Sequence, residues 1–358
     1  MLCLQSWENV RMKNKNINAI IYAFAAAVFY ALNVPCSKLL LGHIPPTFMA
    51  GLLYLGAGIG VGVMYLFHRK KEKPEERLNR KDLPYTVGMV LLDIIAPILL
   101  MIGINIGTSA NASLLGNFEI VATTVIALLI FKENVSGKLW AAVALITLSS
   151  MILSFGGSDI FSFSVGSLFV LGATACWGLE NNCTRSISEK STYQIVTIKG
   201  FCSGAGSVIV ALILGEKLSG MMYVLPALLL GFVAYGLSIF TYIRAQKTLG
   251  AAKTSAYYAA APFIGAFLSF VLLHEELTAA YIAALIVMTA GTALVVADTL
   301  ARHHTHEHTH TFTHTHDGST HTHTVTHSHG HTHYVTDGRH GHRHSSEELE
   351  GLLTGHSS

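Results

Sequence analysis

The sequence predicts an all-α integral membrane protein with ten transmembrane helices, arranged as two inverted five-helix repeats. Low charge, long apolar segments and an internal repeat are the observations that predict this fold. The chain is 51% hydrophobic and only 12% charged, whereas soluble domains average about 25% charged residues. From Tyr85 to Phe131, only Asp93 and Glu119 carry charge. A soluble domain would need a solvated face there, and the sequence offers none.

Ten apolar segments have the length of about 20 residues that crossing a bilayer requires. Short polar breaks or breaks rich in Gly and Pro, such as Gly42–Thr47 and Ser154–Asp159, separate them. The predicted spans cover roughly residues 17–41, 46–67, 84–105, 109–131, 137–155, 164–184, 193–214, 222–243, 251–273 and 278–298.

The distribution of Lys and Arg between the loops predicts the orientation, because cytoplasmic loops carry an excess of these residues. With the N-terminus inside, the inner segments hold seventeen Lys and Arg residues, and the outer segments hold only Lys38 and Lys217. We therefore expect a multi-pass protein of the cell membrane with both termini in the cytoplasm.

The predicted domains follow from these spans. Residues 1–16 form a short cytoplasmic segment, 17–155 the first repeat, 164–298 the second repeat and 301–358 a cytoplasmic tail. The first residues do not resemble a cleavable signal peptide, and Met12 resembles a natural start. The cysteines form no CxxC pair, so no disulfide framework is expected.

Two pairs of stretches reveal the internal repeat. "YALNVPCSK" at Tyr30–Lys38 aligns with "WGLENNCTR" at Trp177–Arg185, at an offset of 147 residues. Glu133 aligns with Glu275 at an offset of 142 residues. Since each repeat has an odd number of spans, the two halves lie upside down relative to each other. Inverted repeats around a midplane site are a common plan of secondary transporters.

These residues resemble a known family. The ten spans, the Trp-Gly-Leu turn at Trp177–Leu179 and the Glu-x-Leu-Thr sequence after span 9 are similar to the EamA type of the drug/metabolite transporter superfamily. The resemblance covers residues 17–298, and it implies alternating access around a central cavity. It also implies a proline in the middle of helices 4 and 9. Pro262 fits this pattern in helix 9, but Ile120, preceded by Glu119, stands at the corresponding place in helix 4.

Polar side chains inside the spans are the candidates for a substrate pathway, because such groups usually face a cavity or one another. Trp177, Glu180, Asn181 and Thr184 have the spacing of one helix face. Glu119 lies near the middle of its span and suits a proton-coupling or cation-binding role, with a packing role as the alternative. Asp93 is expected to pair with Lys199. The predicted pathway residues are Asn33, Asp93, Glu119, Trp177, Glu180, Asn181, Tyr257 and Tyr258.

Other charged groups favour structural roles. Glu133 and Glu275 lie at helix ends, and the mixed-charge loop His68–Asp82 is expected to be solvated and to set the orientation. The sequence contains no Ser/His/Asp grouping at useful positions, no Gly-rich phosphate loop and no HExxH motif. We therefore expect no enzymatic activity and no required cofactor.

The tail carries a histidine at nearly every second position. Because it has few apolar residues, we expect it to stay without regular structure and to bind Zn, Ni, Co or Cu through several imidazoles. The predicted metal ligands are His304, His306, His308, His310, His314, His316, His321, His323, His327, His329, His331 and His333. A low-complexity tail without a physiological metal is the alternative.

Three functions compete on this sequence. The first is a secondary carrier for a small polar or amphipathic metabolite. The second is a carrier for a divalent transition metal, although the spans contain no buried histidine, and the third is a membrane metal sensor or scaffold. The expected partners are a small-molecule substrate, the lipid bilayer and divalent metal ions. A homodimer stays open as an alternative, and no nucleic acid is expected.

Overall fold

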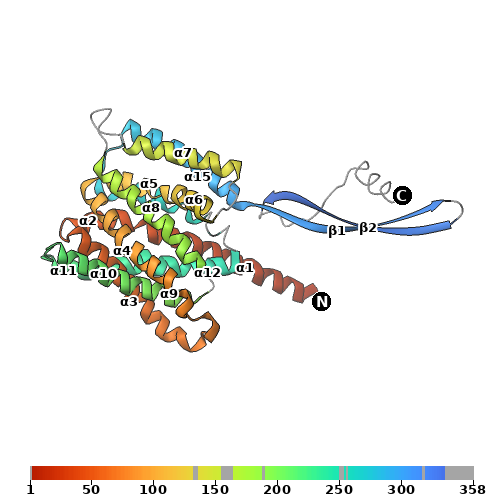
Figure 1. The fold of residues 1–358 in the computed structure, drawn as a ribbon, viewed down its shortest axis with the longest axis horizontal. Helices are drawn as coiled ribbons and strands as arrows, with labels where there is room; N and C mark the ends of the chain where they lie inside the picture. Colours follow the sequence, from red (N-terminus) through yellow and green to blue (C-terminus); the bar gives the residue numbers. More distant parts are fainter. Residues whose placement is uncertain are drawn as a thin grey trace. The chain divides into compact units, whose positions relative to one another are not determined.

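The computed structural model describes residues 2–131, 136–154, 164–187, 190–249, 254, 257–316 and 319–334; the side chains of residues 2–16 and of the tail lie outside this description. The chain divides into two compact units, Met1–Asp298 and Thr299–Ser358. The first unit, here called the helical body, contains the described helices (Figure 1). The second contains the tail.

The first half of the helical body begins with one long helix that extends into the segment predicted to precede the first span. It comprises α1 (Leu2–Ala31), α2 (Asn33–Leu41), α3 (Pro46–His68), α4 (Leu83–Ile106), α5 (Ser109–Leu115), α6 (Phe118–Phe131) and α7 (Gly137–Ser154). The loop between α3 and α4, residues 69–82, is here called the strap. It contains three 3₁₀ turns, at Arg69–Lys71, Pro74–Glu76 and Arg80–Asp82.

The second half of the helical body begins at α8 and contains two π-helical segments. It comprises α8 (Val165–Ser186), α9 (Thr192–Ile198), the π-helical segment η4 (Lys199–Ser203), α10 (Gly204–Ile213), α11 (Met221–Gly231), the π-helical segment η5 (Phe232–Leu237), α12 (Ser238–Leu249), α14 (Ala261–Leu273) and α15 (Ala279–Leu300).

Seven helices among the described residues are long and apolar enough to cross a membrane, and each coincides with a predicted span. They are Ile17–Leu41, Pro46–Lys71, Pro74–Ile106, Gly137–Ser154, Thr192–Ile213, Met221–Ala245 and Ala279–Asp298. The other predicted spans fall on α5 with α6, on the more polar α8 and on the 13-residue α14. The number of ten spans therefore stays a prediction.

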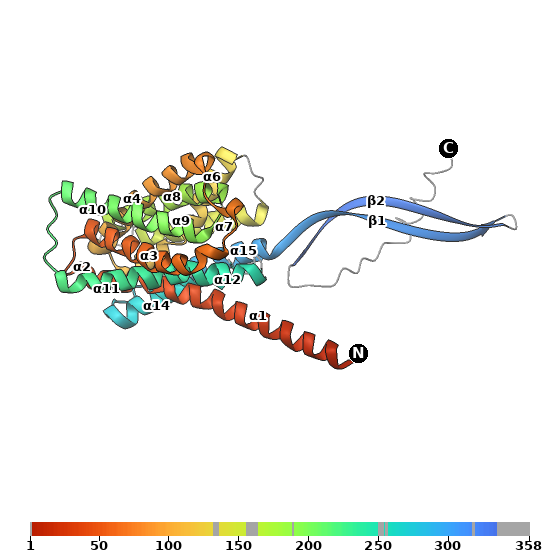
Figure 2. The same ribbon diagram turned by 90° about the horizontal axis from the view of Figure 1, so that it is seen from below.

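Contacts between the two halves are reciprocal. The third segment of the first half, α4, packs against α8, which opens the second half, and α12, the third segment of the second half, packs against α1. In the same way α6 packs against α8, and α14 packs against α1. This exchange of equivalent contacts is what two related halves require. The helix α3 packs against α9 and α10 and also against α11 and η5 (Figure 2).

Glycines allow α3 to lie directly against the backbones of its neighbours. A Cβ on Gly200 would lie 2.4 Å from Gly58, and a Cβ on Gly56 would lie 2.0 Å from the carbonyl oxygen of Leu228. Small residues promote such close approach in membranes, where dispersion contacts and hydrogen bonds drive helix association. The two π-helical segments, η4 and η5, both pack on this helix.

At the end of the helical body opposite the strap, charged side chains cap helix termini. The Glu275 carboxylate accepts hydrogen bonds from the backbone N–H groups of Ser109 and Ala110 at 2.7 and 2.8 Å. Lys38 donates to the carbonyls of Ile104 and Gly107 at 2.5 and 2.7 Å. An anion at a helix N-terminus and a cation at a C-terminus complement the helix dipole. The structural role predicted for Glu275 is therefore present, and it joins the second half to the first; Glu133 lies outside the described residues.

The tail differs from the prediction of a segment without regular structure. Ala301–His316 (β1) and Ser319–Tyr334 (β2) form an antiparallel pair of strands in which Ala301 pairs with Tyr334. The sequence offers a reason for the difference, because threonine is β-branched and favours strands, and because His and Thr alternate with the period of a strand. The fold is therefore all-α in the helical body only.

Candidate functional site

A buried ion cluster joins three helical segments of the helical body. The Lys199 ammonium of η4 lies 3.0 Å from Asp93 Oδ2 of α4 and 3.0 Å from Glu180 Oε1 of α8. The Asp93 and Glu180 side chains are 0% and 3% exposed, and the Lys199 side chain is 17% exposed. The predicted pairing of Asp93 with Lys199 is confirmed, and Glu180 is a second carboxylate in the same cluster.

Each carboxylate also accepts a hydrogen bond from one hydroxyl group. Tyr54 of α3 donates to Asp93 Oδ1 at 2.9 Å, and Thr184 donates to Glu180 Oε1. Charges taken out of water are tolerated only where they are paired and hydrogen-bonded. With both carboxyls ionised, the three charged groups sum to one negative charge, so the cluster suits an additional proton or a cationic group.

A chain of tyrosines continues from the ion cluster. The Tyr54 ring lies 5.2 Å from the Tyr235 ring, and Tyr30 lies 6.0 Å from Tyr235 and 5.8 Å from Tyr258. Asn33 is 0% exposed and donates from its amide to the Tyr235 hydroxyl at 2.9 Å. Aromatic faces with hydroxyl groups at their edges can hold an amphipathic solute through both apolar and polar contacts.

Glu119 forms a third acidic position beside this cluster. Its carboxylate accepts a hydrogen bond from the Asn181 amide at 2.6 Å. It also lies close enough to Glu180, Lys199 and Tyr258 to interact with them electrostatically. Asn181 and Glu180 are consecutive residues of α8, so the hydrogen bond of Asn181 holds Glu119 beside the ion cluster.

Irregular backbone occurs where these residues lie. Lys199 begins the π-helical segment η4, and Tyr235 lies within η5. The first span is interrupted between Ala31 and Asn33, because Pro35 has no N–H to donate to the Ala31 carbonyl. Single π-helical turns are frequent at functional sites, and broken helices line the sites of many transporters.

The structure separates the predicted pathway residues into three groups. Asn33, Asp93, Glu180 and Tyr258 join the contacts described above, as do Glu119 and Asn181. Trp177 is 7% exposed, packs in the main hydrophobic core and also interacts with Tyr54 of the site. Tyr257 is 38% exposed, unlike its neighbour Tyr258, because adjacent helical residues point in different directions.

Sequence reasoning missed Tyr54 and Tyr235, which connect the ion cluster to Tyr30, Asn33 and Tyr258. Both lie in the middle of apolar helices, where a tyrosine is a common packing residue, and only a three-dimensional contact distinguishes the two roles. Lys199 was found only as a partner of Asp93. A lysine within an apolar span carries a stronger signal of its own, because a cation there needs a compensating charge.

The described side chains form no cluster of potential metal ligands. No set of three or more His, Cys, Asp and Glu residues among them could hold a metal ion. The side chains of the histidines predicted to bind metal, His304 to His333, lie outside the described residues.

Comparison with known proteins agrees with the two-halved architecture. Residues 17–155 and 164–297 each match the EamA-like transporter family. The chain belongs to this family. The EamA match therefore covers both halves of the helical body and ends before the tail.

Individual relatives carry transporter names. An uncharacterized transporter of Methanothermobacter thermautotrophicus is 27% identical over 71% of this chain and 79% of its own length. The uncharacterized transporter YyaM of Bacillus subtilis is 22% identical over 72% of this chain and 86% of its own length. A solved crystal structure shares the fold with a TM-score of 0.59 and 16% identity, covering 78% of this chain and 96% of that chain. The EamA-like chain is accordingly a multi-pass membrane transporter.

Proposed function

We propose that this EamA-like protein is a secondary carrier that moves a small polar or amphipathic metabolite by alternating access. The observation that carries the proposal is the buried ion cluster of Asp93, Lys199 and Glu180, which draws groups from both halves of the helical body. Buried ion clusters are costly in a bilayer and mark substrate or ion pathways. A scaffold would not need one at the junction of two related halves.

The chemistry of the cluster suggests how a solute could be coupled to a conformational change. Asp93 and Glu180 compete for one ammonium group, so a proton or a cationic group of the solute can replace Lys199 at one of them. Because these residues lie on different helices, such an exchange changes the forces between the two halves. We propose that Glu119, held by Asn181, supplies the coupling proton or binds the cation.

The reciprocal contacts of the two halves support an inverted arrangement of ten spans. Two equivalent sets of contacts, α4 with α8 and α12 with α1, can be exchanged between two states of equal architecture. We further propose that the strap lies on the cytoplasmic side, because it contains seven Lys and Arg residues.

Flux into liposomes tests the carrier. The purified protein is reconstituted and screened with amino acids, nucleosides and divalent metals, with and without a pH gradient. We expect flux of an organic solute that the Lys199→Met variant loses. Uptake of a divalent metal with no organic solute would replace this proposal by the metal-carrier alternative.

A second proposal concerns the tail, which we infer binds divalent transition metals. In an antiparallel pair, directly opposed residues and residues two apart share one face. The register opposes His304 to His331, His306 to His329, His308 to His327 and His314 to His321. All twelve histidines predicted as ligands therefore have positions on one face of the pair, and Zn, Ni, Co and Cu are held by such imidazoles.

Deletion of residues 301–358 separates the roles that this binding could have. Zinc binding by the full-length protein, measured by titration calorimetry, should fall to background in the deleted protein. If organic flux then loses only its response to zinc, the tail is a regulator; if metal flux falls, the metal-carrier alternative gains support. Unchanged zinc binding would contradict the proposal.

A further inference from the structure

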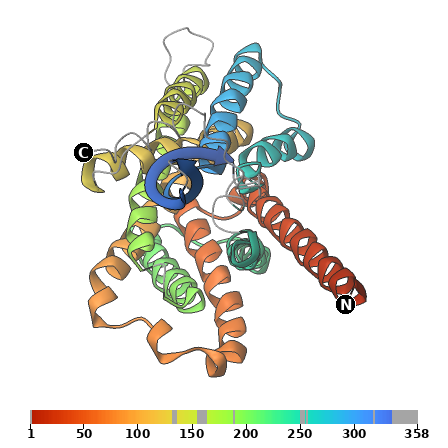
Figure 3. The ribbon, with the colours of Figure 1, turned by 90° about the vertical axis from the view of Figure 1, so that its right-hand side faces the viewer.

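The strap differs from the solvated loop that the sequence predicts, because it is docked on the second half of the helical body. Figure 3 shows it in orange between α3 and α4. Its backbone carbonyl at Glu76 accepts from the Ser191 N–H at 2.6 Å, and the Leu78 N–H donates to Gln194 Oε1 at 3.0 Å. Lys190 adds a hydrogen bond to the Glu75 carbonyl at 3.1 Å. The strap, which connects α3 to α4 in the first half, is therefore bound to the α8–α9 connection and to α9 of the second half.

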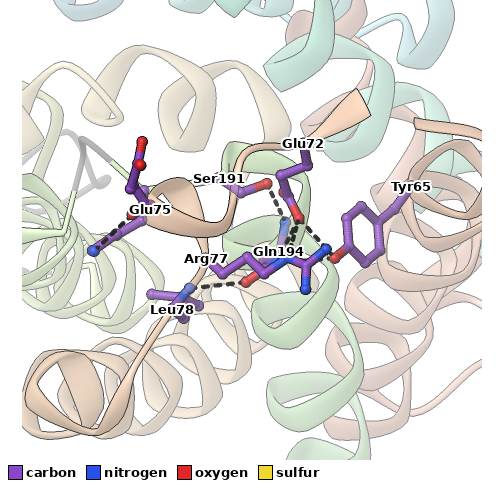
Figure 4. A network of polar contacts seen from close by, with 8 residues as sticks. Tyr65, Glu72, Glu75, Arg77, Leu78, Ser191 and Gln194 are labelled. Atoms are coloured by element: carbon purple, nitrogen blue, oxygen red, sulfur yellow. Dashed lines mark hydrogen bonds and ion pairs between the residues drawn. The ribbon is translucent and has the colours of Figure 1, made fainter. Parts of the chain in front are cut away.

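A buried carboxylate lies at the centre of this contact. The Glu72 side chain is only 2% exposed (Figure 4). Its Oε2 atom accepts hydrogen bonds from the Tyr65 hydroxyl at 3.0 Å and from Gln194 Nε2 at 2.8 Å, and it lies 3.6 Å from Arg77 Nε. A solvated loop exposes its carboxylates, and acidic residues are almost never fully buried unless they are paired.

The contacts of Glu72 are unevenly distributed. All three reach Oε2, whereas the buried Oε1 has no hydrogen-bond partner among the described residues. The Arg77 side chain is 55% exposed, so solvent weakens its attraction for Glu72. A buried polar atom without a partner opposes docking, so the unpaired Oε1 offsets part of the favourable contacts that hold the strap. This balance suits a contact that must form and break.

The strap is connected to helices that carry Asp93 and Lys199 of the ion cluster and their neighbour Tyr54. It follows α3, which carries Tyr54, and leads into α4, which carries Asp93. Gln194, the main partner of Glu72, lies on α9, which continues directly into η4 and Lys199. Release of the strap would therefore free the ends of the same helices whose side chains meet in the cluster.

We propose that the strap is a gate at its end of the carrier, and that Glu72 is the latch that holds the gate closed against α9. This inference rests on the proposed alternating access. The latch opens when Glu72 leaves Gln194 and Tyr65, which exposes its carboxylate to water and separates the strap from the α8–α9 connection and from α9.

A native cysteine reports on the gate without any substrate. Cys183 packs with Leu78 against the small apolar cluster of Met89, Ile187 and Ile195, and the protein contains it as a free thiol. The test uses full-length protein in lipid nanodiscs, with Cys3, Cys36, Cys176 and Cys202 replaced by serine. The rate of Cys183 labelling by a charged maleimide measures how often the region opens.

Removal of the latch should raise this rate. We expect Glu72→Ala and Gln194→Leu each to increase labelling about tenfold, in line with the loss of hydrogen bonds to a charged group. Their double variant should increase labelling by less than the product of the two single increases, since both variants remove the same hydrogen bond between Glu72 and Gln194. Glu72→Gln, which keeps an acceptor for Tyr65 and Gln194, should label more slowly than Glu72→Ala.

Glu75→Ala is the matched control. Glu75 belongs to the same strap, but its side chain is exposed, and its contact with Lys190 is made by the backbone carbonyl. Equal labelling of Glu72→Ala and the parent protein, with both eluting as monodisperse species, would overturn the latch. So would an equal increase in Glu75→Ala. A failed search for a transported solute bears on the proposed function and leaves this labelling result intact.

Discussion

Two clusters in the EamA-like body contain buried carboxylates, and the two clusters stabilise these carboxylates with different groups. In the ion cluster, Asp93 and Glu180 share a buried ammonium, with hydrogen bonds from Tyr54 and Thr184. In the strap, Glu72 depends on neutral donors and on a half-exposed arginine. The difference teaches that burial of a carboxylate alone does not define its role. A buried ammonium that binds two carboxylates holds helices together, whereas a carboxylate held by neutral donors and an exposed arginine can be released.

The largest expected effect comes from removing the cation of the ion cluster. Lys199→Met leaves two buried carboxylates without their partner, and breaking a buried ion pair in this way costs about 3–5 kcal/mol. We expect flux to fall at least about a hundredfold and thermal stability in detergent to decrease. Flux assays and thermal unfolding measure these two effects.

A matched lysine and a compensating change control this prediction. Lys217 is exposed, so Lys217→Met should leave stability and flux unchanged. Combining Lys199→Met with Asp93→Asn removes one of the unpaired charges and should recover part of the stability. Equal stability of Lys199→Met and the parent protein would show that the cluster does not hold the helices together.

The next effect concerns coupling at Glu119. Glu119→Gln keeps an acceptor for Asn181 but cannot exchange a proton in the relevant range. Flux driven by a pH gradient should be lost, while exchange of solute at equal pH continues. The exposed Glu276 supplies the control, since Glu276→Gln should keep the gradient response. If the Glu119→Gln variant responds to the pH gradient as the parent protein does, proton coupling depends on another residue.

Part of these sites could be predicted from the sequence. Asp93 with Lys199 was predictable, because opposite charges within apolar spans need each other. A structural role for Glu275 followed from its place at a helix end, whereas its capping of α5 came from the structure. The halves of the body were predictable from aligned motifs such as Tyr30–Lys38 and Trp177–Arg185, and the family match covers both.

Other features depend on geometry that the linear pattern does not contain. The docking of Glu72 requires the strap and α9 to meet, although they are separated by more than a hundred residues in sequence. Tyr235 and Lys199 occupy π-helical segments, which a regular helical period cannot indicate. The strands of the tail were missed because low apolar content was given more weight than the alternation of Thr and His.

A smaller effect is expected at the opposite end of the helical body. Glu275→Ala removes the acceptor for two N–H groups of α5, which should destabilise the protein by roughly 1–3 kcal/mol. Thermal unfolding in detergent measures this loss. The adjacent, exposed Glu276 is the control, and Glu276→Ala should change stability by less than about 0.5 kcal/mol. Equal losses in the two variants would contradict a specific capping role.

The smallest expected effect separates two neighbouring tyrosines. Tyr258 packs against Tyr30 at 5.8 Å and lies 3.5 Å from the Ser238 hydroxyl, whereas Tyr257 is 38% exposed. Tyr258→Phe keeps the ring but removes the hydroxyl, so we expect a change in solute affinity of only a few fold, consistent with the loss of about 0.5–1.5 kcal/mol for one hydrogen bond. Tyr257→Phe should leave affinity unchanged. Concentration dependence of flux in liposomes measures both variants under the same conditions. If Tyr257→Phe changes affinity more than Tyr258→Phe does, the solute contacts the face of this segment that is exposed in the structure, and the tyrosine chain leading from the ion cluster is not its path.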